Sequence, residues 1–495
     1  MKKHFLIFLL SSIAISLSAQ KINWGPELQQ SRKNSIEIIA GEDERGIYVY
    51  TERAQLFVST VPVIEHYDKK MILKYSTPLK QLAKRAIQID NFWHFNNKLF
   101  IYYTQYSRKQ KKQILYYQEI DKKTGKLLDK PQELVKLPSF YRNPVQYSAS
   151  SDSSKAVIFH TPIVEVGLFQ KTPRATFQLH VLDQSLKNIW NKDIKTPYDA
   201  DLFDAEKVEV SKKGNAYILA RIYNKSRREK RNGQANYFYK IIAYTNNGET
   251  LKEYDLALDG LYITDITFKV NNNGKLTCAG FYSERSATTV KGSFFFTINT
   301  ATSKIEKKGF EPFKEGFLAQ LMSKRRARKG RELYRYYLDD IILRSDGGAV
   351  LIGEQYYSTS NTFYSGVGMN RVPNTTYTYH YEDIIIININ PDASIAWASS
   401  IPKNQSSSTK AFSSYAQATA KGKIYFIYNE KISRRSPVII ASVNTRGKVD
   451  VKELFKNKDE GIITRPELCR QTSKDEMIMY GERGKRYKFG KLVFD

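Results

Sequence analysis

The chain has 495 residues, with 78 Lys and Arg against 50 Asp and Glu, a formal net charge of +28, and two cysteines. Two cysteines exclude a protein held together by a disulfide framework, and the length allows one large core or several domains. The positive charge predicts attraction to polyanions.

The N-terminus has the features of a secretory signal peptide. Lys2 and Lys3 precede an apolar run at 5–17, and Ser18-Ala19-Gln20 offers a small-residue cleavage site. The apolar run is too short to span a bilayer. We therefore expect residues 1–19 to be removed, leaving an exported chain, residues 20–495, that is not an integral membrane protein. Its expected partners are then a protein, an acidic glycan or lipopolysaccharide; nucleic acid is not expected.

A turn followed by an aromatic-rich apolar strand occurs eight times along the chain. A repeated unit of this length cannot bury its own apolar faces, so it must stack on its neighbours. Because no Pro/Ser/Gly-rich linker divides the chain, we expect a single repeat domain. The eight copies are 46–52, 98–105, 155–162, 215–223, 275–283, 348–357, 423–430 and 476–483.

The clearest unit contains four predicted antiparallel strands, here called A to D, at 263–270, 275–283, 292–300 and 304–310. The turn residues 271–274 separate strands A and B. The same order of strands recurs at 208–256 and 338–401. Four antiparallel strands per ~60 residues, with little helical periodicity, are typical of a β-propeller blade. The sequence thus predicts an all-β fold, a single propeller of eight blades, with a seven-bladed ring as the alternative.

The two ends of the chain complement each other. The last unit has predicted strands at 463–470, 476–483 and 487–494, and it lacks strand D. The segment 21–28 resembles the internal D strands 187–194 and 394–401, since each contains Trp followed four residues later by Leu or Ile. We therefore expect the N-terminal strand to complete the last blade and close the ring. Cys278 and Cys469 fall in different units and are expected to be two free thiols.

Basic residues gather in particular loops. In an antiparallel blade the B–C and D–A connections share one face of the disc, and most long connections are of these two kinds. Long loops are where binding residues are usually found. We predict that this face binds an anionic or protein partner through Arg108, Lys109, Lys111, Lys112, Arg227, Arg228, Lys230, Arg231, Lys324, Arg325, Arg326, Arg328, Lys329, Arg331, Arg434 and Arg435.

The longest B–C insertion, 358–378, is rich in hydroxyl and aromatic residues. Tyr-rich surface loops provide rigid contact area for proteins or sugars. An aromatic contact surface is predicted there, although the same rings would also serve simply to pad a long hairpin. Its residues are Tyr357, Phe363, Tyr364 and Tyr377.

Motifs of enzymes and metal sites are missing from the sequence. It contains no H-E-x-x-H, G-x-S-x-G, P-loop or EF-hand pattern, and its histidines after residue 19 are isolated. We therefore name no catalytic residue, metal ligand or cofactor. Asp339-Asp340 opens a predicted strand A and is the best candidate for an acid pair in the central channel.

The signal ending in Ser18-Ala19-Gln20, the Tyr- and Lys-rich units and the block 331–353 resemble uncharacterised exported propeller-like proteins of Bacteroidota-type bacteria. The resemblance implies an envelope location and carries no catalytic residues. Because the C-terminus reads as a blade strand and not as a sorting domain, the periplasm is expected, with outer-membrane association or secretion as alternatives.

Three functional hypotheses follow from these patterns. The first is a non-enzymatic envelope scaffold that presents the basic face to a partner, for instance as an accessory subunit of an outer-membrane assembly. The second is a module that binds acidic glycans or lipopolysaccharide. The third is a propeller hydrolase or lyase that uses channel carboxylates.

Overall fold

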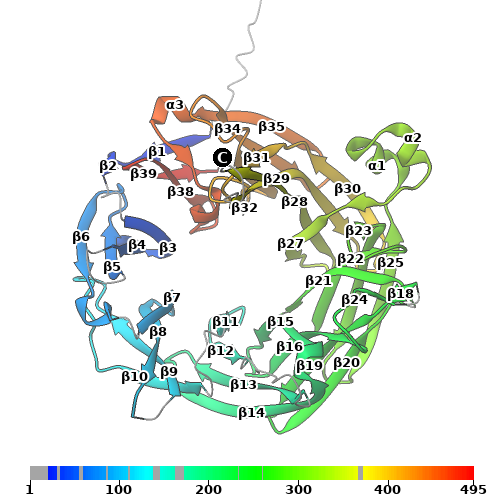
Figure 1. Ribbon diagram of the computed structural model, residues 1–495, viewed down its shortest axis with the longest axis horizontal. Helices are drawn as coiled ribbons and strands as arrows, with labels where there is room; N and C mark the ends of the chain where they lie inside the picture. Colours follow the sequence, from blue (N-terminus) through cyan, green and yellow to red (C-terminus); the bar gives the residue numbers. More distant parts are fainter. Residues whose placement is uncertain are drawn as a thin grey trace, which may run out of the picture.

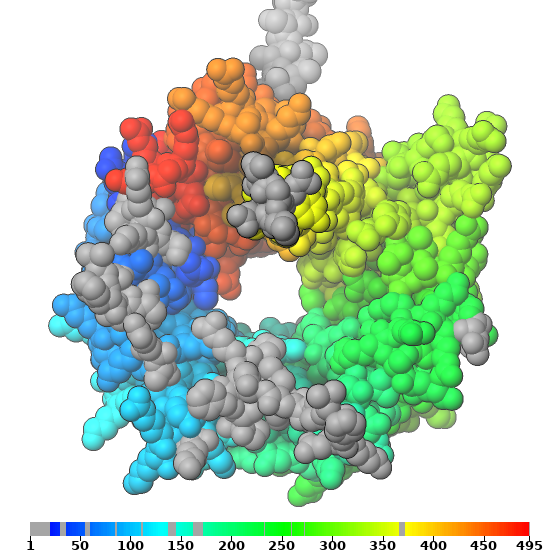
Figure 2. Space-filling model, viewed as in Figure 1, coloured from blue at the N-terminus to red at the C-terminus, as the bar shows by residue number. Residues whose placement is uncertain are grey.

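The computed structural model describes residues 20–29, 34–54, 60–84, 87–109, 112–137, 145–161, 172–231, 233–258, 260–271, 273–365 and 372–494. The predicted signal peptide, 1–19, lies outside the described residues. The chain forms a ring of β-sheets around a central opening (Figures 1 and 2). The fold is all-β, a single β-propeller, as the sequence predicts.

Eight sheets make up the ring, and each has four main strand positions in antiparallel order. Strand A of each sheet lies next to the central channel, and strand D lies at the outer edge (Figure 1). In the first four blades the strands are β3 (Asn34–Asp43), β4 (Gly46–Arg53), β5 (Val61–Tyr67) and β6 (Leu73–Pro78); β7 (Ile87–Phe95), β8 (Lys98–Ser107), β9 (Lys112–Ile120) and β10 (Gln132–Leu137); β11 (Val145–Ala149), β12 (Lys155–His160), β13 (Arg174–Asp183) and β14 (Asn188–Asp199); β15 (Phe203–Val210), β16 (Ala216–Tyr223), β19 (Tyr237–Thr245) and β20 (Thr250–Leu256).

The next four blades follow the same order, and the last of them contains the N-terminal segment. Their strands are β21 (Tyr262–Val270), β22 (Leu276–Ser283), β24 (Gly292–Asn299) and β25 (Lys304–Pro312); β27 (Tyr336–Leu343), β28 (Ala349–Ser365), β29 (Val372–Ile389) and β30 (Ile395–Ile401); β32 (Ala416–Ala420), β33 (Lys423–Asn429), β34 (Pro437–Asn444) and β35 (Val449–Lys456); β36 (Ile463–Thr464), β37 (Arg470–Gln471), β38 (Glu476–Arg483), β39 (Arg486–Val493), β1 (Lys21–Trp24) and β2 (Leu28–Gln29).

All eight predicted B strands are the second strands of the eight sheets. They are apolar because each is covered on both faces by the adjacent blades. In β22 every residue is buried, and in β4 the first six are. The spaces between blades are filled by interdigitating aromatic and branched side chains, for example Phe268 and Phe296 between the fourth and fifth blades.

Closure by the N-terminal strand is confirmed, and with it the eight-bladed ring. Lys21 pairs with Val493 and Trp24 with Gly490, antiparallel to β39. The strand is interrupted at 25–27 and resumes at Leu28, which pairs with Tyr487.

The tryptophans of the outer strands do not pack alike. The indole of Trp190 donates to the carbonyl oxygen of Gly214 in the following blade, and that of Trp397 donates to Thr445 in the following blade. Trp24 instead packs edge-on against Phe455 of the preceding blade, with ring centroids 5.4 Å apart. The Trp pattern therefore identified the strand that completes the last blade. It did not indicate whether the tryptophan packs on the preceding or the following blade.

One strand prediction is wrong in detail. The segment 463–470 is not a continuous strand A but two short strands, β36 and β37, separated by the 3₁₀ turn η4 (Pro466–Leu468). Proline has no amide hydrogen to donate to the ladder, so Pro466 interrupts pairing with β38. Cys278 and Cys469 are both free thiols, as expected.

Candidate functional site

Insertions enlarge one face of the disc, which we call the loop face. It carries the B–C and D–A connections. The small hairpin β17 (Lys230–Arg231) and β18 (Gln234–Ala235) lies between β16 and β19, and helices α1 (Glu315–Leu321) and α2 (Lys324–Arg328) lie between β25 and β27. These two helices project from the outer edge of the ring (Figure 1). Strands β28 and β29 extend beyond their blade as a long two-stranded hairpin.

The predicted basic residues lie in connections of the loop face or, for Lys112, at the strand end next to one, and those described are exposed. Lys111 lies outside the described residues. The cations do not converge on one patch, because α2 is at the outer edge while the other runs occupy three other blades. Arg227 is engaged by both carboxylate oxygens of Asp204, at 2.8 and 2.9 Å, and Arg328 pairs with Glu315.

The predicted aromatic residues divide between the two sides of the long hairpin. Phe363, Tyr364 and Tyr377 are 50%, 66% and 54% exposed. Tyr357 is less exposed: it stacks on His380 at 4.5 Å and its hydroxyl donates to Glu382. The space-filling view shows this hairpin, in yellow, beside the central opening (Figure 2).

A row of tyrosines follows one side of this hairpin. In the register of β28 and β29, Tyr356 pairs with Tyr381, Ser358 with Tyr379 and Ser360 with Tyr377. Directly opposite residues, and every second residue along a strand, share one side of a sheet. The tyrosine stripe on this side therefore consists of Tyr356, Tyr381, Tyr379 and Tyr377. Tyr364 lies on the same side further out, beyond the Thr362–Thr375 pair.

Strand A of several blades contains a β-bulge at the same place. In each, one residue is left out of the pairing with strand B, and bulges of this kind re-aim side chains. Four of the five bulged residues are acidic, so the channel wall carries a series of carboxylates. These residues are Glu37, Asp90, Glu206, Thr264 and Asp339.

The bulge separates the two acids of the predicted pair. Asp340 is engaged by neighbouring blades: Lys269 lies 3.2 Å from its Oδ1 and Gln417 donates to its Oδ2. Asp339 instead faces the hydroxyl of Tyr415, which donates to its Oδ2 at 2.6 Å. The two carboxylates therefore have different surroundings, and Asp339 lines a pocket.

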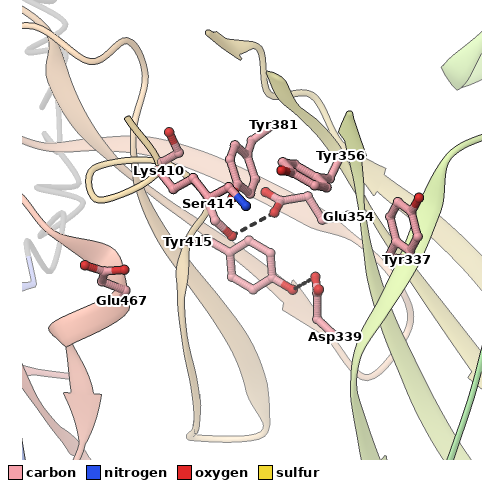
Figure 3. Close-up of a pocket in the computed structure, with 10 residues that line it drawn as sticks. Tyr337, Asp339, Glu354, Tyr356, Tyr381, Lys410, Ser414, Tyr415 and Glu467 are labelled. Atoms are coloured by element: carbon pink, nitrogen blue, oxygen red, sulfur yellow. Dashed lines mark hydrogen bonds between the residues drawn. The ribbon is translucent and has the colours of Figure 1, made fainter. Parts of the chain in front are cut away.

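That pocket has a volume of about 380 Å³ and lies where the tyrosine stripe meets the channel (Figure 3). Strand β27 provides one wall, β28 and β29 the second, and the loop before β32 the third. In Figure 3 the carboxylates of Asp339 and Glu354 point toward Tyr415 and Ser414. The lining residues are Tyr337, Asp339, Glu354, Tyr356, Tyr381, Lys410, Ser413, Ser414, Tyr415 and Glu467.

A buried ion pair supports the floor of the pocket. The Lys403 ammonium lies 2.7 Å from Glu354 Oε1, and the two side chains are 0% and 4% exposed. Lys403 also donates to the carbonyl oxygen of Tyr381 and to Gln405. Gln405 in turn accepts from the backbone of Ser414, whose hydroxyl donates to Glu354 at 2.7 Å. This network fixes the loop that carries Ser414 and Tyr415.

Burial and like charge shape the acidity of the pocket. Asp339 keeps exposed surface in β27, but desolvation by the residues around it, reinforced by the neighbouring Glu354, raises its pKa to about 7. Burial also raises the pKa of Glu354, although Lys403 opposes this, and it lowers the pKa of Lys403. Glu206, further along the channel wall, keeps exposed surface, but desolvation by the residues around it raises its pKa to about 7. The channel mouth thus gathers carboxylates and tyrosine rings.

Sequence reasoning found Asp339 but missed the pocket around it. One available signal was Glu354, a lone acid within the apolar strand 348–357, because a buried carboxylate needs a cation partner. Its partner Lys403 is far away in sequence and becomes a neighbour only when β30 pairs with β29.

The described residues contain neither a metal-binding cluster nor a membrane-spanning helix. Within them, no group of three or more His, Cys, Asp and Glu side chains is placed to hold a metal ion. No helix in the described part of the chain is long and apolar enough to cross a membrane.

Comparisons with known proteins give no family for this chain. No protein-family model matches the chain, and no curated protein matches it significantly. Among solved structures it is similar to the WD40 domain of SCAP from fission yeast (TM-score 0.41, 8% identity, covering 95% of this chain and 98% of that one). It is also similar to the Dos1 propeller (0.43, 8%, 95% and 95%) and to the polysaccharide lyase Uly1 (0.38, 9%, 95% and 99%).

Proposed function

We propose that this protein is a non-enzymatic interaction scaffold of a bacterial cell envelope that binds an anionic or protein partner through its loop face. One observation carries the proposal: the long insertions and the exposed hairpin aromatics belong to connections of that face, and the predicted cations lie in or next to them. Binding residues are commonly carried by loops on a rigid scaffold. Export by residues 1–19 and a periplasmic location are part of this proposal.

The cations on and after α2 are the sharpest part to test. Lys324, Arg325 and Lys329 are exposed, and none has an ion-pair partner among the described residues. They are therefore free to attract an anionic surface, and such attraction weakens as salt increases. The bidentate partner of Arg227 makes that residue a poorer choice, since its charge is already compensated.

The experiment compares two triple variants of equal charge change. Lys324→Glu/Arg325→Glu/Lys329→Glu should lose most binding to anionic vesicles or to solubilised envelope components at low salt. The control, Lys213→Glu/Arg446→Glu/Lys474→Glu, alters exposed cations in A–B and C–D turns of the opposite face and should retain it. Equal losses in both variants, or none in either, would refute a loop-face scaffold.

Recognition of an acidic glycan remains an alternative for the outer part of this face, where Phe363, Tyr364 and Tyr377 are exposed. It does not extend to the pocket, because ionised Asp339, which has no ion-pair partner among the described residues, would repel an acidic sugar there. A hydrolase or lyase that uses Asp339 and Asp340 together is not favoured, because Asp340 is already engaged by Lys269 and Gln417.

A further inference from the structure

The pocket beside the channel differs in chemistry from the basic loops around it. Its rings come from β27, β28, β29 and the loop before β32, and Tyr356 and Tyr381 lie with centroids 4.7 Å apart. Carboxylates of Asp339, Glu354 and Glu467 lie among these rings. Aromatic faces and carboxylates both attract cations. Three of the four charged side chains that line the pocket are acidic, in a chain of net charge +28.

The protein's own Lys410 shows what the pocket wall accepts. Its ammonium nitrogen lies 5.2 Å from the ring centroid of Tyr356 and 4.9 Å from that of Tyr379. Lys410 is exposed, and among the described residues it has no carboxylate within ion-pair distance. The rings hold this ammonium without an acid partner, and contact with the Tyr356 hydroxyl raises the pKa of Lys410.

The three pocket carboxylates differ in whether a cation pairs with them. Glu354 is neutralised by Lys403, and Glu467 pairs with Arg465. Asp339 receives a hydrogen bond from Tyr415 but has no ion-pair partner among the residues that the structure describes. A cation entering the pocket would therefore supply the one charge that Asp339 lacks.

We propose that this pocket binds a primary alkylammonium group, such as a lysine side chain, between the tyrosine rings and Asp339, and that Lys410 occupies part of the site until the ligand displaces it. The inference goes beyond the loop-face proposal and does not depend on it. The chemistry is shared by a free amine and by a lysine of a protein partner, and the test separates these two sources.

Binding should strengthen with rising pH. Asp339 is faced by Glu354 on β28, Asp265 on β21, Lys403 after β30, and Tyr415 before β32. Lys410 before β32 and Glu467 in η4 line the same pocket. Its pKa of about 7 means that it is mostly protonated in weakly acidic solution and charged above neutrality. The ligand ammonium, with an ordinary pKa near ~10.4, stays charged throughout. Affinity should therefore rise about tenfold from one pH unit below the pKa of Asp339 to one unit above it.

Calorimetric titration with Nα-acetyl-lysine methylamide tests the site, and its ε-acetylated form is the matched neutral ligand. The lysine derivative should bind and the ε-acetylated one should not. Lys410→Ala, a change at an exposed residue, should tighten binding by removing the internal competitor. Asp339→Asn should weaken binding and abolish its pH dependence, with thermal unfolding used to confirm that the variant is folded.

Several results would overturn the inference. These are no binding to wild type or to Lys410→Ala, equal affinity for the ε-acetylated ligand, or preference for a neutral oligosaccharide. If a lysine-containing peptide binds more tightly than the free derivative, the ligand of the pocket is a lysine of a protein. Equal affinity would show that the ligand is a small free amine. The loop-face variant at Lys324, Arg325 and Lys329 should bind the lysine derivative normally, so failure of one proposal is distinguishable from failure of the other.

Discussion

The charged side chain of Lys403 is fully buried, and its ammonium nitrogen lies 2.7 Å from Glu354 Oε1. Desolvating two charges is costly, and their attraction compensates only when further hydrogen bonds complete the geometry. Here Tyr381 and Gln405 accept from the ammonium, and Ser414 donates to the carboxylate. The pair thus joins β28 to the loop that forms one pocket wall. The buried charge of Lys403 therefore helps to hold this loop in place.

Removing one member of this pair should be worse than removing both charges. Lys403→Met leaves Glu354 buried and unpaired, and we expect it to lower the free energy of unfolding by about 3–5 kcal/mol. The double variant Lys403→Met/Glu354→Gln retains an acceptor for Ser414 and should recover part of that loss. Urea titration followed by tyrosine fluorescence measures both. A double variant no more stable than Lys403→Met would contradict the argument.

The channel carboxylates should make stability depend on pH. Glu206 keeps exposed surface, but desolvation by the residues around it raises its pKa to about 7, above the ordinary 4.5, so the folded state keeps a proton that the unfolded chain releases. Stability therefore falls as pH rises from about 4.5 to 7. Glu206→Gln removes this loss. Its melting temperature should exceed that of wild type at alkaline pH and approach it in weak acid; a constant difference across pH would contradict this assignment.

At the scale of elements, the sequence predicts strands better than it predicts their irregularities. Apolar periodicity and turn residues locate every B strand because each is covered on both faces. The bulges at Glu206 and Asp339 are not visible in the sequence, since an acid at that place also suits a regular edge strand. A residue is bulged out of the strand pairing when the backbone register between its strand and the adjacent strand shifts. That register depends on the packing of the whole blade.

The candidate site illustrates the same limit. The loop face follows from the order of strands, so the placement of its basic and aromatic runs is accessible to sequence reasoning. The pocket is not, because Glu354, Lys403 and Tyr415 meet only through packing of adjacent blades. The break at Pro466 shows a local signal that strand periodicity alone overlooks.

At the scale of the whole molecule, closure joins segments that are distant in sequence. Beyond the pairing of β1 with β39, the hydroxyls of Tyr67 and Tyr487 lie 3.0 Å apart and Lys491 pairs with Glu42. Arg470 donates to the carbonyl oxygens of Ile39 and Ala40. The interface between the eighth and first blades thus has polar and apolar contacts like those between other adjacent blades. No blade is therefore a weakly attached end of the ring.

A circular permutant tests this equivalence. Lys21 lies opposite Val493, so a short linker from residue 494 to residue 20 would create an ordinary C–D hairpin. New ends can be placed in the exposed turn between β19 and β20, at Asn246 and Asn247. One turn is closed and a similar one opened, so the free energy of unfolding should change by only about 1 kcal/mol.

The control permutant is opened between Ala279 and Gly280, within the fully buried strand β22, and should not fold. Circular dichroism and thermal unfolding compare the two chains with wild type. If the permutant opened at Asn246 also failed to fold, the N-terminal strand would need a free end in order to dock. The eighth blade would then differ from the other seven, and closure would be a late step in folding rather than one more blade contact.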